Sequence, residues 1–146
     1  MKIEFRRSDA CSEPRVIIEA PEETDEVRRL MKLLEAKGPV VLNGYAEQRI
    51  ERIPETEIVR IYGERQRVYV ETTFGRFLLR ERLYELEARL DAHLFVRISN
   101  SEIVNSRYIL RLDASLTGTI CLHMAGGAKA YASRRYVPAL RRHFGL

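Results

Sequence analysis

The chain has 146 residues, 45% of them hydrophobic, which is enough apolar material for one folded core with a short extension. It has no apolar run of membrane-spanning length and no charged-then-apolar leader at residues 1–5, so we expect a cytoplasmic protein. The net charge of +4 is unevenly divided: residues 1–96 hold 17 Lys and Arg against 19 Asp and Glu, whereas residues 97–146 hold 8 against 2. A basic C-terminal third favours a surface that binds a polyanion, although an arginine-rich solvated surface is the simpler alternative.

Residues 1–40 are predicted to form a β-helix extension, with short strands at residues 1–5 and 15–19 and a helix over residues 24–37. Thr24 is a suitable N-cap, and Gly38-Pro39 ends the helical pattern. Four apolar residues at helical spacing form one stripe, which we interpret as core packing: Val27, Leu30, Met31 and Leu34. The alternative for this stripe is contact with a second copy or a partner.

After Pro39 the hydrophobic pattern changes to period two, which is typical of strands. The predicted strands are residues 40–46, 49–53, 58–62, 67–72, 76–79, 94–98, 108–112, 119–124 and 129–132. Two short helices are predicted over residues 82–90 and 136–144, the second with Pro138 in its first turn. Many short strands with few helices predict a mainly β (α+β) domain over residues 41–146.

The sequence lacks the usual signatures of an enzyme. It has no phosphate-binding glycine motif and no HExxH, and its histidines and cysteines lack zinc-ligand spacing. A nucleophile built from Cys121 and a distant histidine is the remaining alternative, but a small cysteine on a strand is much commoner. We therefore predict no enzyme, no cofactor, no metal and no small-molecule substrate.

Two segments carry groups suited to nucleic acid. In the first, residues 95–105, apolar alternation breaks at Ser-Asn-Ser, and the amide of Asn100 has the donor and acceptor that read adenine. A turn-stabilising Asn is the alternative. In the second segment, residues 133–142, four arginines flank a turn and the start of a helix. Arginines placed there can bind phosphate or guanine, and the alternative is a solvated basic helix end.

Together these segments resemble the LytTR DNA-binding domain. The pattern Phe95-x-Arg97-x-Ser99-x-Ser101-x-Ile103-Val104-Asn105, followed by Ser133-Arg134-Arg135-Tyr136-Val137, is similar to that family's two motifs. The resemblance covers about residues 41–146 and is to a stand-alone subgroup without a receiver domain. Ser99 stands where many members have histidine. The resemblance implies a transcription regulator built as an elongated stack of small antiparallel sheets, whose loops enter successive major grooves of double-stranded DNA.

The resemblance also implies roles for individual residues. Asn100 is expected to contact a base, and Arg135 a base or a phosphate. The expected contacts to the DNA backbone are Ser99, Ser101, Arg97, Arg134 and Lys129. Gln66 and Arg67 occupy a loop-to-strand position from which the family also reaches DNA.

The expected partners are double-stranded DNA, a second copy of the chain bound beside the first as a homodimer, and a small membrane regulatory protein. Residues 1–40 are a possible dimerisation or regulatory segment. Two alternatives stay open: a structured RNA-binding module, against which Tyr62, Tyr69 and Tyr108 are explained mostly as packing residues, and a protein-interaction adaptor that uses the helix at residues 24–37.

Overall fold

The computed structural model describes residues 1–35, 40–115 and 117–146. The chain forms two compact units, Met1–Gly38 and Pro39–Leu146, which we describe separately. The predicted helix end at Lys37 and the Gly38-Pro39 stop lie outside the described residues.

In its described residues, 1–35, the first unit has one element, the helix α1 (Asp25–Glu35). Thr24 caps it as predicted, because its Oγ1 accepts a hydrogen bond from the Val27 N–H at 3.3 Å. The predicted strands at residues 1–5 and 15–19 are wrong: these residues form no strand, and most of their large apolar side chains, such as Phe5 at 91% exposure, are open to solvent. A short apolar pattern alone does not make a strand, since a strand needs a neighbour for its backbone hydrogen bonds.

The predicted core packing of the α1 stripe is also wrong, because no residue of α1 is buried. The described part of this unit contains no second element against which the helix could pack.

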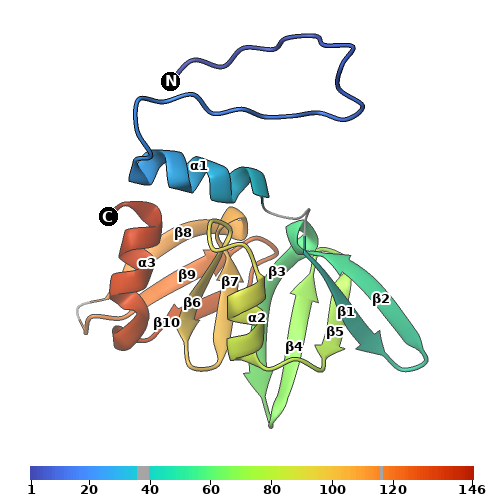
Figure 1. Cartoon of the computed structure of the whole chain (residues 1–146). Coiled ribbons are helices and arrows are strands. Elements are labelled where there is room, and N and C mark those ends of the chain that lie inside the picture. The colour runs from blue at the N-terminus through green and yellow to red at the C-terminus, as the bar shows by residue number, and fades with distance from the viewer. Residues whose placement is uncertain (36–39, 116) are drawn as a thin grey trace. The chain divides into compact units, whose positions relative to one another are not determined.

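The second unit is built on a seven-stranded antiparallel sheet with the order β2-β1-β5-β4-β3-β7-β6 (Figure 1). Its strands are β1 (Val41–Ala46), β2 (Arg49–Pro54), β3 (Ile58–Glu64), β4 (Arg67–Thr72), β5 (Gly75–Leu79), β6 (Phe95–Ser99) and β7 (Glu102–Asn105). A second antiparallel sheet has the order β10-β9-β8 and contains β8 (Ile109–Ala114), β9 (Ile120–Met124) and β10 (Lys129–Ala132). The prediction of a mainly β protein with antiparallel sheets and short helices is confirmed.

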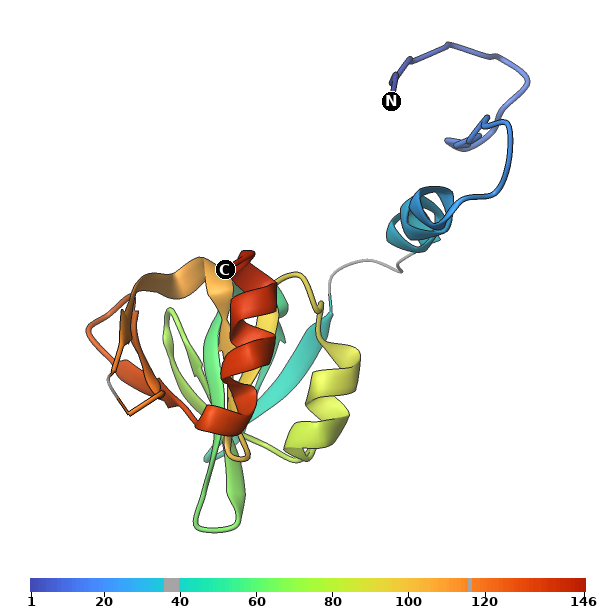
Figure 2. The same ribbon diagram turned by 90° about the vertical axis from the view of Figure 1, so that its left-hand side faces the viewer.

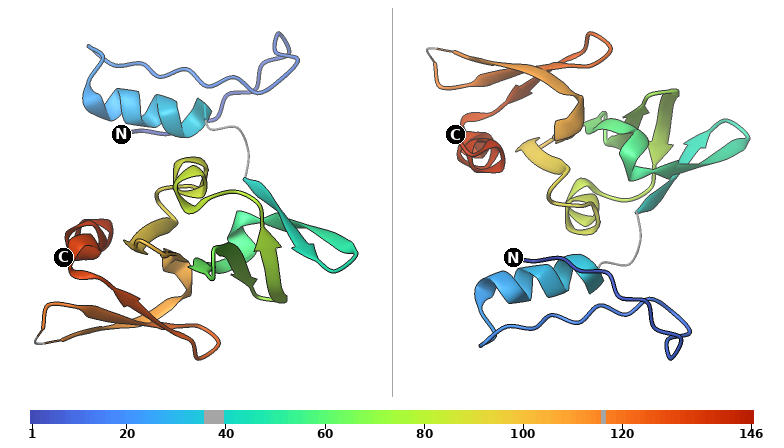
Figure 3. Two further views of the ribbon diagram at one scale, coloured as in Figure 1. Left: turned by 90° about the horizontal axis from the view of Figure 1, so that it is seen from below. Right: turned by 90° about the horizontal axis from the view of Figure 1, so that it is seen from above.

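Two helices pack on this framework: α2 (Leu83–Arg89) and α3 (Val137–Phe144). In the views from below and from above, α2 and α3 lie on either side of β6 (Figure 3). Pro138 sits in the first turn of α3 as predicted, and Gly145 ends the helix in the left-handed conformation with φ of 68°.

Two hydrophobic cores stabilise the unit. The first lies between the seven-stranded sheet and α2, where Ile61, Val70 and Leu86 are buried. The second joins β6 and β7 to the small sheet and α3, where Ile98, Leu122 and Leu140 are buried. Because β6 and β7 contribute to both cores, the turn that joins them stands on a rigid base.

Candidate nucleic-acid interface

Three connecting segments project from one edge of the second unit (Figures 1 and 2). They are the β3–β4 turn, the β6–β7 turn, and the short 3₁₀ helix η3 (Arg134–Tyr136) that leads from β10 into α3. The first two are linked by a hydrogen bond of 2.7 Å from the Gly63 N–H to the Ser101 carbonyl, and the last two by one of 2.9 Å from the Ser133 N–H to the Ile98 carbonyl. These three segments therefore form one connected surface, which we call the loop edge.

The β3–β4 turn is a tight hairpin with Arg65 and Gln66 at its tip. Both have positive φ, 50° and 65°, as a two-residue hairpin turn requires. These two side chains and that of Arg67 are exposed. The structure therefore brings Gln66 and Arg67 to the same edge as the residues of the β6–β7 turn.

The β6–β7 turn is held by Arg97. This guanidinium donates hydrogen bonds to the Ser99 carbonyl at 2.8 Å and the Asn100 carbonyl at 2.6 Å, and it pairs with Glu87 of α2 at 2.6 Å. Ser99 and Ser101 interact through their hydroxyl oxygens, which are 3.3 Å apart, and Asn100 between them is exposed. In this structure Arg97 stabilises the turn, and only 15% of its side chain is exposed.

The segment η3 brings the second motif beside the first. Its last residue, Tyr136, donates a hydrogen bond from its hydroxyl to Oδ1 of Asn100 at 2.9 Å. Arg134 and Arg135 are exposed and form no ion pair with any described residue. Asn100 and Arg135 thus both contact Tyr136, and a carboxamide and a guanidinium are groups suited to bind base edges and phosphate oxygens.

Lys129 is the one expected contact that the structure does not bring to this edge. It opens β10 opposite His123, whereas Arg134 follows the other end of the strand. Three residues at the edge were missed from the sequence: Arg65 at the β3–β4 tip, Tyr136 and Glu87. Arg65 has a local signal, as a basic residue in a polar turn, and Tyr136 stands in the second motif but had no role assigned to it. Glu87 acts through a partner distant in sequence.

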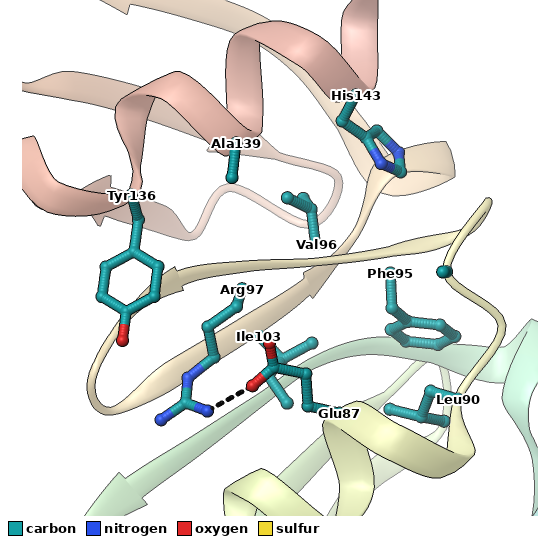
Figure 4. Close-up of a pocket in the computed structure, with 10 residues that line it drawn as sticks. Glu87, Leu90, Phe95, Val96, Arg97, Ile103, Tyr136, Ala139 and His143 are labelled. Carbon is teal, nitrogen blue, oxygen red and sulfur yellow. Dashed lines mark hydrogen bonds and ion pairs between the residues drawn. The ribbon is translucent and has the colours of Figure 1, made fainter.

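A cleft of about 420 Å³ lies behind the edge, between α2, β6 and α3. Figure 4 shows its apolar floor, which includes Phe95 and Leu90, and its polar rim, which includes Arg97 and Tyr136. At its far end lies His143, where burial, followed by the nearby charge of His93, lowers the pKa of the imidazole. The neutral ring is therefore favoured at neutral pH.

A polar cluster lies on the outer face of the small sheet, away from this edge. There His123 Nε2 is 2.6 Å from Asp113 and 3.9 Å from Cys121, and the hydrogen bond from His123 is the main cause that lowers the pKa of the Asp113 carboxyl. As predicted, Cys121 and His123 point away from the buried Leu122.

Among residues 1–35, 40–115 and 117–146, no group of three or more His, Cys, Asp or Glu side chains is arranged to hold a metal ion. Within the same residues, no helix has the length and apolar character needed to cross a membrane.

These features define a β-rich module with a basic loop edge, and comparison with known proteins identifies its family. Residues 48–145 match the family model of the LytTr DNA-binding domain, so the chain belongs to this family. Two uncharacterized HTH-type transcriptional regulators of Staphylococcus aureus, from strains MSSA476 and MW2, are each 31% identical over 147 residues, which span 100% of this chain and 99% of theirs. A third, from strain NCTC 8325, is 31% identical over 136 residues, 92% of each chain.

A solved structure supports the fold. The LytTr DNA-binding domain of a Bacillus cereus protein named as a methyl-accepting/DNA response regulator matches with a TM-score of 0.72 and 22% identity, covering 75% of this chain and 100% of that one. Although the relatives are named as HTH-type, the described part of the second unit has no pair of consecutive α-helices: α2 is followed by β6, and α3 is preceded only by the 3₁₀ helix η3.

Proposed function

We propose that this protein is a sequence-specific, double-stranded DNA-binding transcription regulator that reads DNA with its loop edge. The observation that carries the proposal is the hydrogen bond between Tyr136 and Asn100 across 36 positions of sequence, which unites the two basic and polar segments in one surface. Membership of the LytTr DNA-binding domain family and the names of the relatives support the same conclusion.

We assign Asn100 and Arg135 to base contacts, because both are exposed at the edge and Asn100 has the amide groups that match adenine. Arg134, Ser101, Gln66 and Arg67 are assigned to positioning contacts with phosphates. None of the helices in the described residues is a long basic recognition helix, so we assign entry into the major grooves to the loops.

The assignment predicts that Asn100→Ala and Arg135→Ala each weaken binding to a selected duplex by about 1–3 kcal/mol, because each removes a base contact. Fluorescence anisotropy titrations of the full chain measure this. The same titrations should show a log–log slope against salt of roughly −4 to −8, as counterions leave the phosphates.

Arg107→Ala is the matched control. Arg107 is also exposed and also forms no ion pair among the described residues, but it follows β7 at the end opposite the β6–β7 turn. It should bind like the wild type. Equal losses for Arg107→Ala and Arg135→Ala would show a general charge effect and remove the site assignment.

We also propose that two copies bind adjacent half-sites as a homodimer, as the family resemblance implies. In α1, Leu33 and Leu34 are each 55% exposed, so this helix has apolar surface available for contact with another copy or with a protein partner. The spacing of half-sites in selected duplexes tests the paired arrangement.

The RNA-binding alternative is less well supported by the sheet surface. Tyr62 and Tyr69 stack on each other with ring centroids 5.8 Å apart, and the guanidinium groups of Arg60 and Arg76 cover them at 4.6 and 3.9 Å. Rings covered in this way offer little free surface on which a base could stack. Competition between the selected duplex and single-stranded RNA separates the two functions.

A further inference from the structure

Tyr136 lies where the two halves of the proposed interface meet. Its hydroxyl lies 2.9 Å from Oδ1 of Asn100, and its ring centroid is 5.7 Å from the guanidinium carbon of Arg135. The same ring lies 6.0 Å from the guanidinium carbon of Arg97. One half-buried aromatic side chain therefore contacts both side chains to which we assign base reading.

The hydrogen bond sets the orientation of the Asn100 amide. A phenol is a better donor than acceptor, so Tyr136 favours the rotamer in which Oδ1 faces it and Nδ2 faces outward. Oδ1 has a second lone pair, and no described residue accepts a hydrogen bond from Nδ2. Adenine requires this pair of groups, an acceptor for N6–H and a donor for N7, in one fixed order.

The backbone of the same residue is held from the other side of the cleft. Arg97 donates to the Asn100 carbonyl at 2.6 Å, and Glu87 of α2 holds Arg97 in place (Figure 4). The main chain of Asn100 is thus anchored to α2, and its side chain is anchored to η3 and α3 through Tyr136. With the main chain fixed, the amide rotamer becomes the main remaining freedom of this residue.

We infer that Tyr136 is a positioning residue that determines base specificity, by orienting the Asn100 amide through its hydroxyl and supporting Arg135 through its ring. This inference rests on the proposed function. Tyr136 itself need not contact DNA, since its hydroxyl proton is committed to Asn100 and its ring lies close to two guanidinium groups.

Two variants separate the contribution of the Tyr136 hydroxyl from that of its ring. Each is titrated with a duplex selected by the wild type and with a set of duplexes that each differ from it by one base pair. Tyr136→Phe should reduce discrimination about five-fold, and only at the base pair whose recognition Asn100→Ala also impairs. Tyr136→Leu should also reduce discrimination at the pair recognised by Arg135. Tyr131→Phe, which removes the hydroxyl of an exposed tyrosine on β10, is the control and should bind as the wild type.

A double variant provides the strictest form of the test. In an Asn100→Ala background, Tyr136→Phe should have no further effect, because the hydroxyl acts only through that amide. Additive losses, equal losses at every base pair, or wild-type discrimination by Tyr136→Phe would each overturn the inference while leaving the proposed function intact.

A measurement without DNA distinguishes failure of the inference about Tyr136 from failure of the proposed function. In the free protein, Tyr136→Phe should shift the side-chain amide resonances of Asn100 in ¹⁵N-correlated NMR spectra, and Tyr131→Phe should not. Unchanged resonances would show that the hydrogen bond is absent and overturn the inference. A wild type without any sequence preference would overturn the proposed function, and the inference with it, whatever the resonances show.

Discussion

Two asparagines five positions apart show how the environment decides the role of a residue. Asn105 is fully buried, with Nδ2 donating to the Ile58 carbonyl at 2.9 Å and Oδ1 accepting from the Arg107 N–H at 3.0 Å. Asn100 is exposed, and within its side chain only Oδ1 has a hydrogen-bond partner among the described residues. Asn105 therefore forms hydrogen bonds with backbone groups inside the fold, whereas Asn100 keeps its Nδ2 donors available for a ligand.

Glu102 is a residue whose charge opposes folding. Its side chain is 15% exposed, Oε2 has no hydrogen-bond partner among the described residues, and burial raises the pKa of the carboxyl despite the nearby Arg60. A carboxyl with a raised pKa holds its proton more tightly in the native state. Its contribution to stability is therefore full below its usual pKa and is lost as the pH rises through the raised value.

We therefore predict that Glu102→Gln raises the free energy of unfolding at pH 7 by up to about 1 kcal/mol. The gain should vanish in acid, where the wild-type carboxyl is protonated. Urea melts at pH 7 and pH 4 measure both values. The matched variant Glu71→Gln should instead lose stability at pH 7, since Glu71 pairs with Arg60 at 2.8 Å. A Glu102→Gln protein that is less stable than the wild type at pH 7 would contradict this account.

At the scale of elements, a substitution in the β3–β4 hairpin can have separate effects on stability and on DNA binding. Gln66 sits at φ of 65°, a conformation that costs a side-chain-bearing residue free energy and costs glycine little. Gln66→Gly should therefore keep or raise the free energy of unfolding, by up to about 1 kcal/mol, while weakening binding to the selected duplex. Thermal melting and anisotropy titration of the same sample measure the two effects.

Glu47→Gly offers a comparison for this variant, because Glu47 also has positive φ, 46°, but lies in the β1–β2 turn. It should show the same change in stability with unchanged binding. Binding by Gln66→Gly at wild-type affinity would remove the β3–β4 turn from the interface.

The sequence predicts most elements of the second unit, because period-two alternation marks strands that have one buried face. It predicts α2 to within one residue at each end and places Pro138 correctly in the first turn of α3. The strand β7 was not predicted, since Ile103 packs in one core and Val104 in the other, and a strand buried on both faces shows no alternation. The false strands at residues 1–5 and 15–19 show the converse, an apolar pattern typical of strands without a neighbouring strand.

The interface was only partly accessible from the sequence. The motif around Asn100 and the arginines of η3 are visible as residue types in a pattern. The links that organise them, Glu87 to Arg97 and Tyr136 to Asn100, join segments 10 and 36 positions apart and depend on the packing of α2 and α3 beside β6. Neither link leaves a local signal in the sequence.

At the scale of the whole molecule, the topology of the second unit brings two basic and polar segments that are distant in sequence to one edge. Residues 97–146 hold 8 Lys and Arg against 2 Asp and Glu, whereas residues 1–96 are slightly acidic, and the segments around Asn100 and Arg135 meet at the loop edge of the second unit. That edge also contains the β3–β4 turn, so three segments are available to reach along a duplex (Figure 2). A DNA site read by two such copies should show two blocks of specificity about one helical turn apart.

Selection of bound sequences from a random duplex library tests the central claim most directly. The wild type should enrich a motif with two blocks spaced by about one helical turn or a multiple of it. Asn100→Ala and Arg135→Ala should each lose sequence information at a different position within the blocks, and Arg107→Ala should enrich the wild-type motif. The absence of any enriched motif, or a motif unchanged by both edge variants, would contradict the claim that this edge reads DNA.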